Sequence, residues 1–124
     1  MELQVLDARL TVCKAGSIDD IDLNCQPLFV GITDEEISVV CQEDKAPAVT
    51  EAREDGWRGF RICGEMDFSL IGILSKITAV LAEEKIGVFA VSTYNTDYIL
   101  TKEENFERAL SALESKGYTI KRGR

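Results

Sequence analysis

The sequence contains no histidine, and its four cysteines are widely spaced. Without an imidazole, the Ser-His and Cys-His pairs that activate most hydrolase nucleophiles are excluded. The cysteines form no C-x-x-C pair, so a zinc site is not expected, and we predict no metal or other cofactor. Three of them, Cys13, Cys41 and Cys63, fall in apolar runs typical of strands. We therefore expect free thiols that are buried as small hydrophobic side chains.

Long hydrophobic runs are also missing. No apolar run approaches the ~18 residues of a membrane span, and the first residues, MELQV, lack the basic region and long apolar core of a signal peptide. We therefore expect a cytoplasmic chain. Its 14 basic and 22 acidic residues give a net charge of -8, which repels phosphate backbones and anionic lipids. A small molecule or a protein is the expected partner, rather than nucleic acid or a membrane.

The chain has 124 residues, of which 45% are hydrophobic, so it can bury an ordinary core. Its first half reads mainly as strands. Residues 7–13 alternate between apolar and polar side chains, which predicts a strand. Residues 15–24, rich in aspartate and turn formers, hold at most one helical turn. Residues 28–32 and 37–41 are strand-like and form a hairpin around the four-residue turn 33–36.

Around the middle of the chain the predicted elements change from strands to helices. Pro47 opens an acidic segment, residues 48–54, that we expect to form a helix of about two turns ending at Gly56. Residues 58–63 form the next strand. An apolar stripe of period 3.6 then predicts an amphipathic helix over residues 69–84.

The last part of the chain predicts a second hairpin and a second helix. Gly87 helps to end the first helix. Thr101 and Glu104 fit a capping box at the start of a helix over residues 103–116, which Gly117 ends. The strands expected here are residues 88–92, 98–100 and 118–120. The second half therefore has the order β-α-β-β-α-β of ferredoxin-like folds.

The first half resembles a shortened copy of the second. FVGITDEEISVV and FAVSTYNTDYIL align at an offset of 60 residues, whereas the preceding strands align at an offset of 50 through Cys13 and Cys63. The difference of 10 residues is the length lost where a helix of the first copy has been reduced to AGSIDDIDLN. This pattern predicts an internal repeat with a shortened helix.

The motif S-T-Y-x-T-D-[YF]-I-L is present as STYNTDYIL, with GWRGFRICGEMDFSLIG and EISVVCQED upstream. Over nearly its whole length the chain resembles the bacterial tandem ACT-domain proteins related to the arginine-sensing CASTOR proteins of animals. The resemblance implies an α+β fold of two ferredoxin-like ACT modules, residues 1–56 and 57–124, packed side by side. It also implies an amino acid bound at a module interface and no catalytic activity.

Two segments form the candidate ligand site. The start of the helix near residue 69 offers free backbone N–H groups, which suit a carboxylate, and Gly72 allows close approach. The hairpin turn offers hydroxyls, an amide and a carboxylate, which can hold an ammonium or guanidinium group. The resemblance selects the same two segments, although Leu70 and Ile71 replace the Glu-Cys pair of the arginine-sensing module. The candidate residues are Asp67, Phe68, Ser69, Leu70, Ile71, Gly72, Thr93, Tyr94, Asn95, Thr96 and Asp97.

Simpler interpretations of these residues remain open. Asn95, Thr96 and Asp97 are ordinary turn residues, so the hairpin can be purely structural. Ser69 can serve only as a helix N-cap. For the whole chain, three functions compete: an amino-acid-binding regulatory module, a dimerisation or partner-binding module with a vestigial pocket, and a small enzyme with Asp97 as general acid or base.

The packing expected from the repeat leads to a prediction about assembly. We expect a duplicated α+β sandwich with the helices over residues 69–84 and 103–116 on one face. The loss of most of a helix from the first copy leaves sheet edges and one lightly covered sheet face. We therefore expect a homodimer.

Overall fold

A computed structural model describes residues 1–63 and 72–123 of the chain. The contacts divide the fold into two compact units. Unit 1 combines Met1–Asp7 with Arg58–Arg124, and unit 2 is Ala8–Trp57. Among the described residues, no helix is long and apolar enough to cross a membrane.

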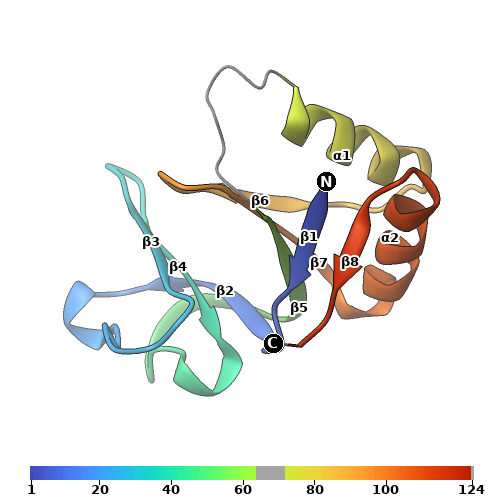
Figure 1. Cartoon of the computed structure of the whole chain (residues 1–124). Coiled ribbons are helices and arrows are strands. Elements are labelled where there is room, and N and C mark those ends of the chain that lie inside the picture. Colours follow the sequence, from blue (N-terminus) through green and yellow to red (C-terminus); the bar gives the residue numbers. More distant parts are fainter. Residues whose placement is uncertain (64–71, 124) are drawn as a thin grey trace. The chain divides into compact units, whose positions relative to one another are not determined.

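Unit 1 is a mixed sheet with two helices (Figure 1). Its strand order is β6-β7-β5-β1-β8, in which β1 runs antiparallel to β5 and parallel to β8. Thus β1 separates β5 from β8, which would be neighbours in a simple ferredoxin-like sheet. The elements are β1 (Glu2–Val5), β5 (Thr50–Ile62), α1 (Ile73–Glu83), β6 (Phe89–Ser92), β7 (Asp97–Lys102), α2 (Glu103–Ser115) and β8 (Thr119–Lys121).

Both helices of unit 1 cover the same face of its sheet, as expected from the sequence. Alternate strand residues point toward the helices and bury their side chains in one core. The helices contribute the apolar stripes that their period of 3.6 produces. The buried core includes Leu3, Val5, Phe60, Ile62 and Ile99 from strands, and Ile77, Leu81, Phe106, Ala109, Leu110 and Leu113 from helices.

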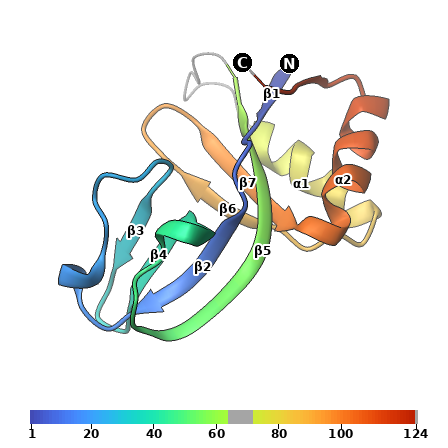
Figure 2. The same ribbon diagram turned by 90° about the horizontal axis from the view of Figure 1, so that it is seen from below.

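Unit 2 is an antiparallel sheet whose connections contain only 3₁₀ turns (Figure 2). Its strand order is β3-β4-β2-β5, which is the ferredoxin-like order. The elements are β2 (Leu10–Ala15), η1 (Ile18–Asp20), β3 (Phe29–Ile32), β4 (Ile37–Gln42), η2 (Glu43–Lys45) and the first part of β5. One face carries a small core of Cys13, Ala15, Ile21, Cys25, Val39 and Cys41.

The predicted helix over residues 48–54 is wrong. Thr50 begins β5, and Ala52, Arg53 and Glu54 lie opposite residues of β2. Pairing along a strand that is already present satisfies the backbone groups of this segment, and this outweighs its local helix signals. Gly56 does not end a helix but sits inside β5 with φ 87°, where the register with β2 shifts.

The ends of several elements also differ from the predictions. Residues 7–13 are not one strand, because β1 ends at Val5 and β2 begins at Leu10. Helix α1 ends in a Schellman motif with Lys85, rather than Gly87, in the left-handed conformation. The capping box is absent: Thr101 is buried in β7, and Lys102 precedes α2 without a side-chain cap. Thr101 belongs to the strand because β7 continues up to the helix.

Other expectations are confirmed. Both hairpins form, and Gly117 ends α2 with φ 99°. Residues 15–24 contain a single 3₁₀ turn. All four cysteines are free, and Cys13 and Cys41 are buried as expected, as is Cys25, whereas Cys63 was expected to be buried and is half-buried.

Candidate functional site

Five of the predicted site residues, Thr93 to Asp97, lie together at the β6–β7 hairpin. Ser92 and Asp97 are the last pair of the ladder, and Thr93 closes the turn. The Thr93 N–H donates to the Thr96 carbonyl at 2.8 Å, and the Thr93 hydroxyl donates to the same oxygen at 2.9 Å. The structure thus brings this half of the predicted site into one compact segment.

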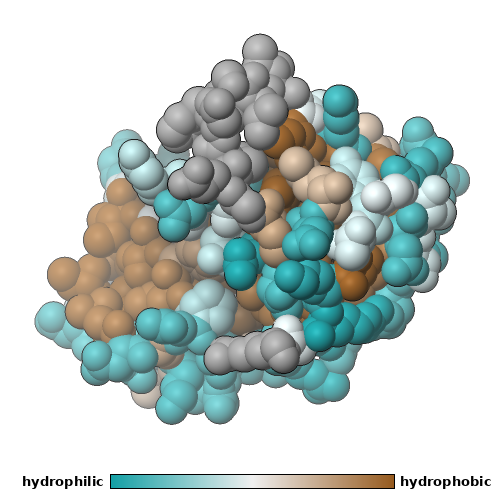
Figure 3. Space-filling view, viewed as in Figure 1, coloured by the Kyte–Doolittle hydropathy of each residue, from teal (hydrophilic) through white to brown (hydrophobic). Residues whose placement is uncertain are grey.

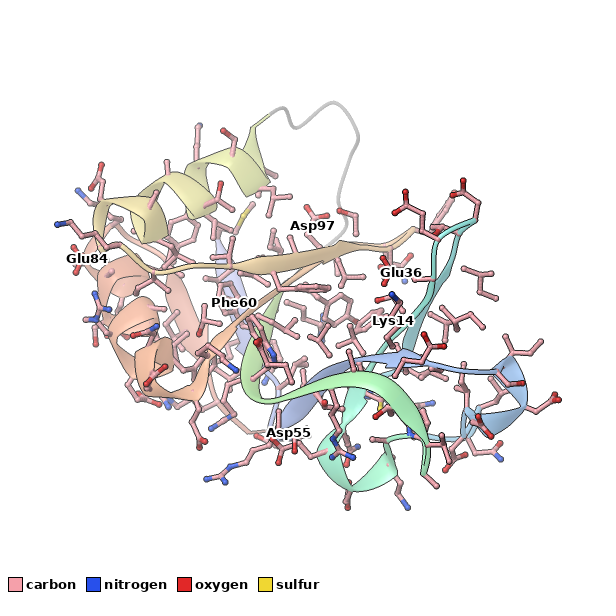
Figure 4. All side chains as sticks on the ribbon, turned by 180° about the vertical axis from the view of Figure 1, so that it is seen from behind. Lys14, Glu36, Asp55, Phe60, Glu84 and Asp97 are labelled. Atoms are coloured by element: carbon pink, nitrogen blue, oxygen red, sulfur yellow. The ribbon has the colours of Figure 1, made fainter. Side chains whose placement is uncertain are left out.

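The hairpin holds two buried polar side chains with defined partners. Asp97, labelled in Figure 4, is 6% exposed. Its Oδ1 accepts a hydrogen bond from the Ser92 hydroxyl at 2.5 Å. Thr96 is 5% exposed, and its hydroxyl donates to the Ile62 carbonyl of β5 at 2.7 Å. Burying a carboxylate costs free energy unless it accepts hydrogen bonds. The hydrogen bond from Ser92 offsets part of this cost and orients the Asp97 carboxylate.

The remaining hairpin residues point outward. Tyr94 is 88% exposed and Asn95 is exposed at the tip of the turn. The hairpin therefore has an outer aromatic and amide group, and an inner hydroxyl and carboxylate. A carboxylate has acceptor capacity for several donors, so this set is suited to an ammonium or guanidinium group.

The other half of the predicted site is described only at Gly72. This residue precedes α1 with φ 84° and ψ 9°, and its carbonyl accepts the Lys76 N–H at 2.9 Å. The conformation is left-handed, which favours glycine. Asp67, Phe68, Ser69, Leu70 and Ile71 lie outside the described residues.

The β3–β4 hairpin of unit 2 repeats the turn geometry of β6–β7 but not its polar pair. The Thr33 N–H donates to the Glu36 carbonyl at 3.0 Å, as Thr93 does to Thr96. At the positions of Ser92 and Asp97, however, this hairpin carries Ile32 opposite Ile37. Since the turn forms equally with an apolar pair, closing the turn does not require the Ser92–Asp97 pair.

Ser92 is the site residue that the sequence prediction missed. It lies outside the polar turn and was counted as the end of a strand. Its signal is its position: in a hairpin with a four-residue turn, the residue before the turn lies opposite the residue after it, here Asp97.

A cavity of about 270 Å³ lies elsewhere on unit 1, where α1 begins and α2 ends. Ile73, the residue after Gly72, lines it, whereas no residue of the β6–β7 hairpin does. Lys76 and Lys116 give the wall positive charge, and Tyr118 adds an aromatic surface. The sequence prediction did not select these residues. Lys76 from the start of α1 and Lys116 from the end of α2 would together suit a carboxylate.

Two thiols of unit 2, those of Cys13 and Cys41, are poorly suited to chemistry. Burial raises the pKa of Cys41 to about 12, with further contributions from the nearby Cys13 and Cys25, and burial also raises the pKa of Cys13. A thiol is nucleophilic or metal-binding only as a thiolate, so these two are inert at neutral pH. Within residues 1–63 and 72–123, no group of three or more acidic or cysteine side chains is arranged to hold a metal ion.

The family model of the ACT domain matches residues 52–115, just over half of the sequence. The chain therefore belongs to the ACT-domain family, and its two helices and mixed sheet form the α+β, ferredoxin-like fold of that family. The matched segment contains α1, the β6–β7 hairpin and α2. No curated protein matches the chain in sequence.

Several solved structures share this fold. A protein of Agrobacterium tumefaciens is 24% identical with a TM-score of 0.85, covering 99% of this chain and 93% of that one. The regulatory subunit of aspartate kinase from Thermus thermophilus is 11% identical with a TM-score of 0.60, covering 91% and 95%. The allosteric aspartate kinase of Clostridium acetobutylicum is 11% identical with a TM-score of 0.65, covering 91% of this chain but 34% of the kinase.

Proposed function

We propose that this chain is a regulatory, non-catalytic protein that binds an amino acid at the β6–β7 hairpin. The observation that carries the proposal is the Ser92–Asp97 pair, which places a buried carboxylate in a hairpin whose turn does not need it. Membership of the ACT-domain family supports it, because ACT domains are regulatory domains that bind amino acids. The similarity to the regulatory subunit of an aspartate kinase is consistent with a non-catalytic role.

In the proposed complex the hairpin binds the positively charged part of the ligand. Asp97 accepts from an ammonium or guanidinium group, while Thr93 and Asn95 add a hydroxyl and an amide. The ligand's carboxylate is bound by backbone N–H groups that precede α1, where Gly72 leaves room for a close approach. Asp67, Phe68, Ser69, Leu70 and Ile71 remain part of this proposed site, as do Tyr94 and Thr96.

We also propose that the chain holds two ACT modules, separated in sequence near residue 56. The hairpin strands support this, because β3 and β6, and likewise β4 and β7, begin at positions 60 residues apart. Both hairpins have the same register, and their last residues, Gln42 and Lys102, have the same backbone angles, φ -63° and ψ 144°. In the proposed first module, the 3₁₀ turns η1 and η2 follow β2 and β4 and would correspond to the two helices of an ACT module.

The proposed relation to the CASTOR proteins rests on the motif STYNTDYIL and on the two modules together. This relation implies that the ligand binds at a module interface. The identity of the amino acid does not follow from the relation alone. The Ser92–Asp97 pair favours a positively charged group of the ligand at this position. This group is either a charged side chain or the α-ammonium group of the amino acid.

We propose that the chain forms a homodimer through the open edges of the unit 1 sheet. Strands β6 and β8 each pair with a single neighbour among the described strands, so both lie at an edge of that sheet, where pairing with a second chain is possible. Light scattering at micromolar concentration tests this assembly, and a monomer mass would exclude it.

A thermal-shift screen of the full chain against the twenty amino acids tests the function. A ligand present at about 100 times its dissociation constant stabilises a protein by about 2.7 kcal/mol, which gives a clear rise in Tm. We expect one amino acid, or a few related ones, to raise Tm. If none does, the chain is instead a dimerisation or partner-binding module with a vestigial pocket.

A further inference from the structure

The negative charge of the chain is concentrated in unit 2. Residues 8–57 contain 11 acidic and 4 basic side chains, a net charge of -7. Unit 1 contains 11 acidic and 10 basic side chains, a net charge of -1. The strong negative field of this protein therefore arises from its smaller unit, and a binding partner of unit 2 must tolerate that field.

Unit 2 also exposes large hydrophobic side chains. Val30 and Ile32 lie opposite Val39 and Ile37 in the β3–β4 ladder, so all four share the face that carries the small core of this unit. Val30 and Ile32 stay exposed because β3 is the last strand of the sheet and a 3₁₀ turn, not a helix, follows β2. Ile32 is 63% exposed, and a full helix would cover such a face in an ordinary α+β fold.

The loop between β2 and β3 extends this surface. Ile18 is 56% exposed and Leu23 is 75% exposed, although the loop is held to the sheet by Ile21 and Cys25. We name the exposed side chains of Ile18, Leu23, Val30 and Ile32 the apolar surface of unit 2. Figure 3 shows hydrophobic residues gathered over the strands and loop of this unit, with hydrophilic residues along the border.

The border is acidic. Exposed carboxylates are close neighbours in sequence of the residues that form the apolar surface, in the loop around η1 and in the turn between β3 and β4. They are Asp19, Asp20, Asp22, Asp34, Glu35 and Glu36. An exposed apolar area with a polar rim of one charge is typical of a protein-binding surface.

We propose that the apolar surface of unit 2 binds an amphipathic, lysine- or arginine-rich segment of a partner protein. The apolar face of such a segment covers Val30 and Ile32, and its basic residues pair with the acidic border. A second copy of the same surface is disfavoured, because a symmetric contact brings the two acidic borders together. Anionic lipids are repelled by the same charges.

Fluorescence anisotropy with a defined probe tests this proposal on the full chain. The probe is a labelled amphipathic helix of leucine and lysine, of about 18 residues or five turns. We expect Ile32→Ser and Leu23→Ser each to weaken binding by about tenfold, equivalent to about 1.4 kcal/mol. We expect the double variant Asp34→Asn/Glu35→Gln to weaken it at low salt and to match the wild type at high salt, where exposed charges are screened.

Matched variants in unit 1 control for general effects. Val88→Ser removes an exposed apolar side chain, and Glu83→Gln/Glu114→Gln removes two exposed charges. Neither should change the Kd of the probe by more than about twofold, which is under half a kcal/mol. Thermal melts check that each variant is folded. If Ile32→Ser does not fold, Leu23→Ser is used for the test, because Leu23 lies in a loop.

Three results would overturn the proposal. One is equal binding of the probe by the wild type and by the unit 2 variants, and another is equally tight binding of a probe with glutamate in place of lysine. The third is a wild-type dimer in light scattering that Ile32→Ser converts to a monomer, because a second copy of the chain would then occupy the surface. None of these results depends on whether the chain binds an amino acid.

Discussion

The Ser92 hydroxyl donates a hydrogen bond to Oδ1 of Asp97 at 2.5 Å, across the last residue pair of the β6–β7 hairpin. The corresponding pair in unit 2 is Ile32 and Ile37. A polar pair is therefore a property of one hairpin and not of the turn itself. This contrast makes Asp97 the most direct target for a test of ligand binding.

Asp97→Asn should weaken binding of the amino acid identified in the thermal-shift screen by about 1.5 to 3 kcal/mol, the range for a hydrogen bond to a charged group. Asparagine keeps an oxygen that can accept from Ser92 but removes the negative charge. The free energy of unfolding should therefore change little. Calorimetric titration measures the affinity, and urea unfolding measures the stability.

Glu104→Gln is the matched control for this test. It removes one negative charge from an exposed position in the first turn of α2, away from the hairpin. We expect its ligand affinity to equal that of the wild type. If Asp97→Asn also binds with wild-type affinity, then Asp97 has only a structural role in the hairpin.

Thr96→Val should destabilise unit 1 by about 1 to 3 kcal/mol, the cost of leaving a buried polar group unpaired. Valine has nearly the same shape but cannot donate to the Ile62 carbonyl, which Thr96 contacts at 2.7 Å. Thr119→Val, at an exposed position of β8, is the control and should change stability little. Urea unfolding curves compare the two, and equal midpoints would show that the buried hydrogen bond contributes nothing.

The free energy of unfolding should decrease as the pH rises above about 9, in part because of Cys41. Burial raises the pKa of this thiol from 9.0 to about 12, so between these values the unfolded chain loses a proton that the folded chain keeps. Stability then falls with pH by at most about 1.4 kcal/mol per pH unit for this group, and the contribution is fully present below pH 9.

Urea unfolding of the wild type and of Cys41→Ala between pH 8 and pH 11 isolates this effect. Alanine lowers stability at every pH by leaving a small cavity, but the decrease with pH should become less steep. Cys63→Ala serves as the control, since Cys63 is half-buried and outside the small core of unit 2. Parallel curves for the wild type and Cys41→Ala would contradict the prediction.

The hairpins and the two helices could be predicted because their signals are local. Alternating apolar residues on either side of a short polar turn predict a hairpin, and an apolar stripe of period 3.6 predicts a helix such as α1. Gly117 could be placed because the left-handed position after a helix favours glycine. The same position after α1 holds Lys85, and no local pattern indicates that.

The errors concern residues whose structure is decided by distant parts of the chain. Residues 48–54 have the composition of a short helix, yet from Thr50 onward they form β5 and pair with β2, about 40 residues earlier. The strand β1 is only four residues long, and it forms because β5 and β8 lie on either side of it. Thr101 resembles a helix cap in sequence, but β7 extends past it and buries its side chain.

The candidate site could be predicted in part for the same reason. Residues 93–97 are neighbours in sequence, so a single motif indicated them together. Ser92 was missed because its role depends on the residue opposite it in the hairpin. The lysines that line the cavity, Lys76 and Lys116, come from the ends of different helices, and only the fold brings them together.

Gly59→Ala should destabilise the chain by about 1 to 3 kcal/mol, the usual cost of overpacking a buried position. A Cβ on Gly59 would lie 3.2 Å from the Ile99 carbonyl oxygen of β7 and 3.3 Å from two side-chain carbons of Leu100. A backbone carbonyl held in a sheet cannot move away as a flexible side chain can. Strands β5 and β7 would have to separate slightly, close to the hairpin that carries Asp97.

Gly31→Ala in β3 is the matched control for this last prediction. A Cβ there has no atom within 4 Å and meets no positive φ, so alanine fits without strain. It should leave stability unchanged or raise it by up to about 1 kcal/mol, because alanine restricts the unfolded chain more than glycine does. Thermal melts of both variants measure the difference, and an equal Tm for the two would contradict the close contact between Gly59 and β7.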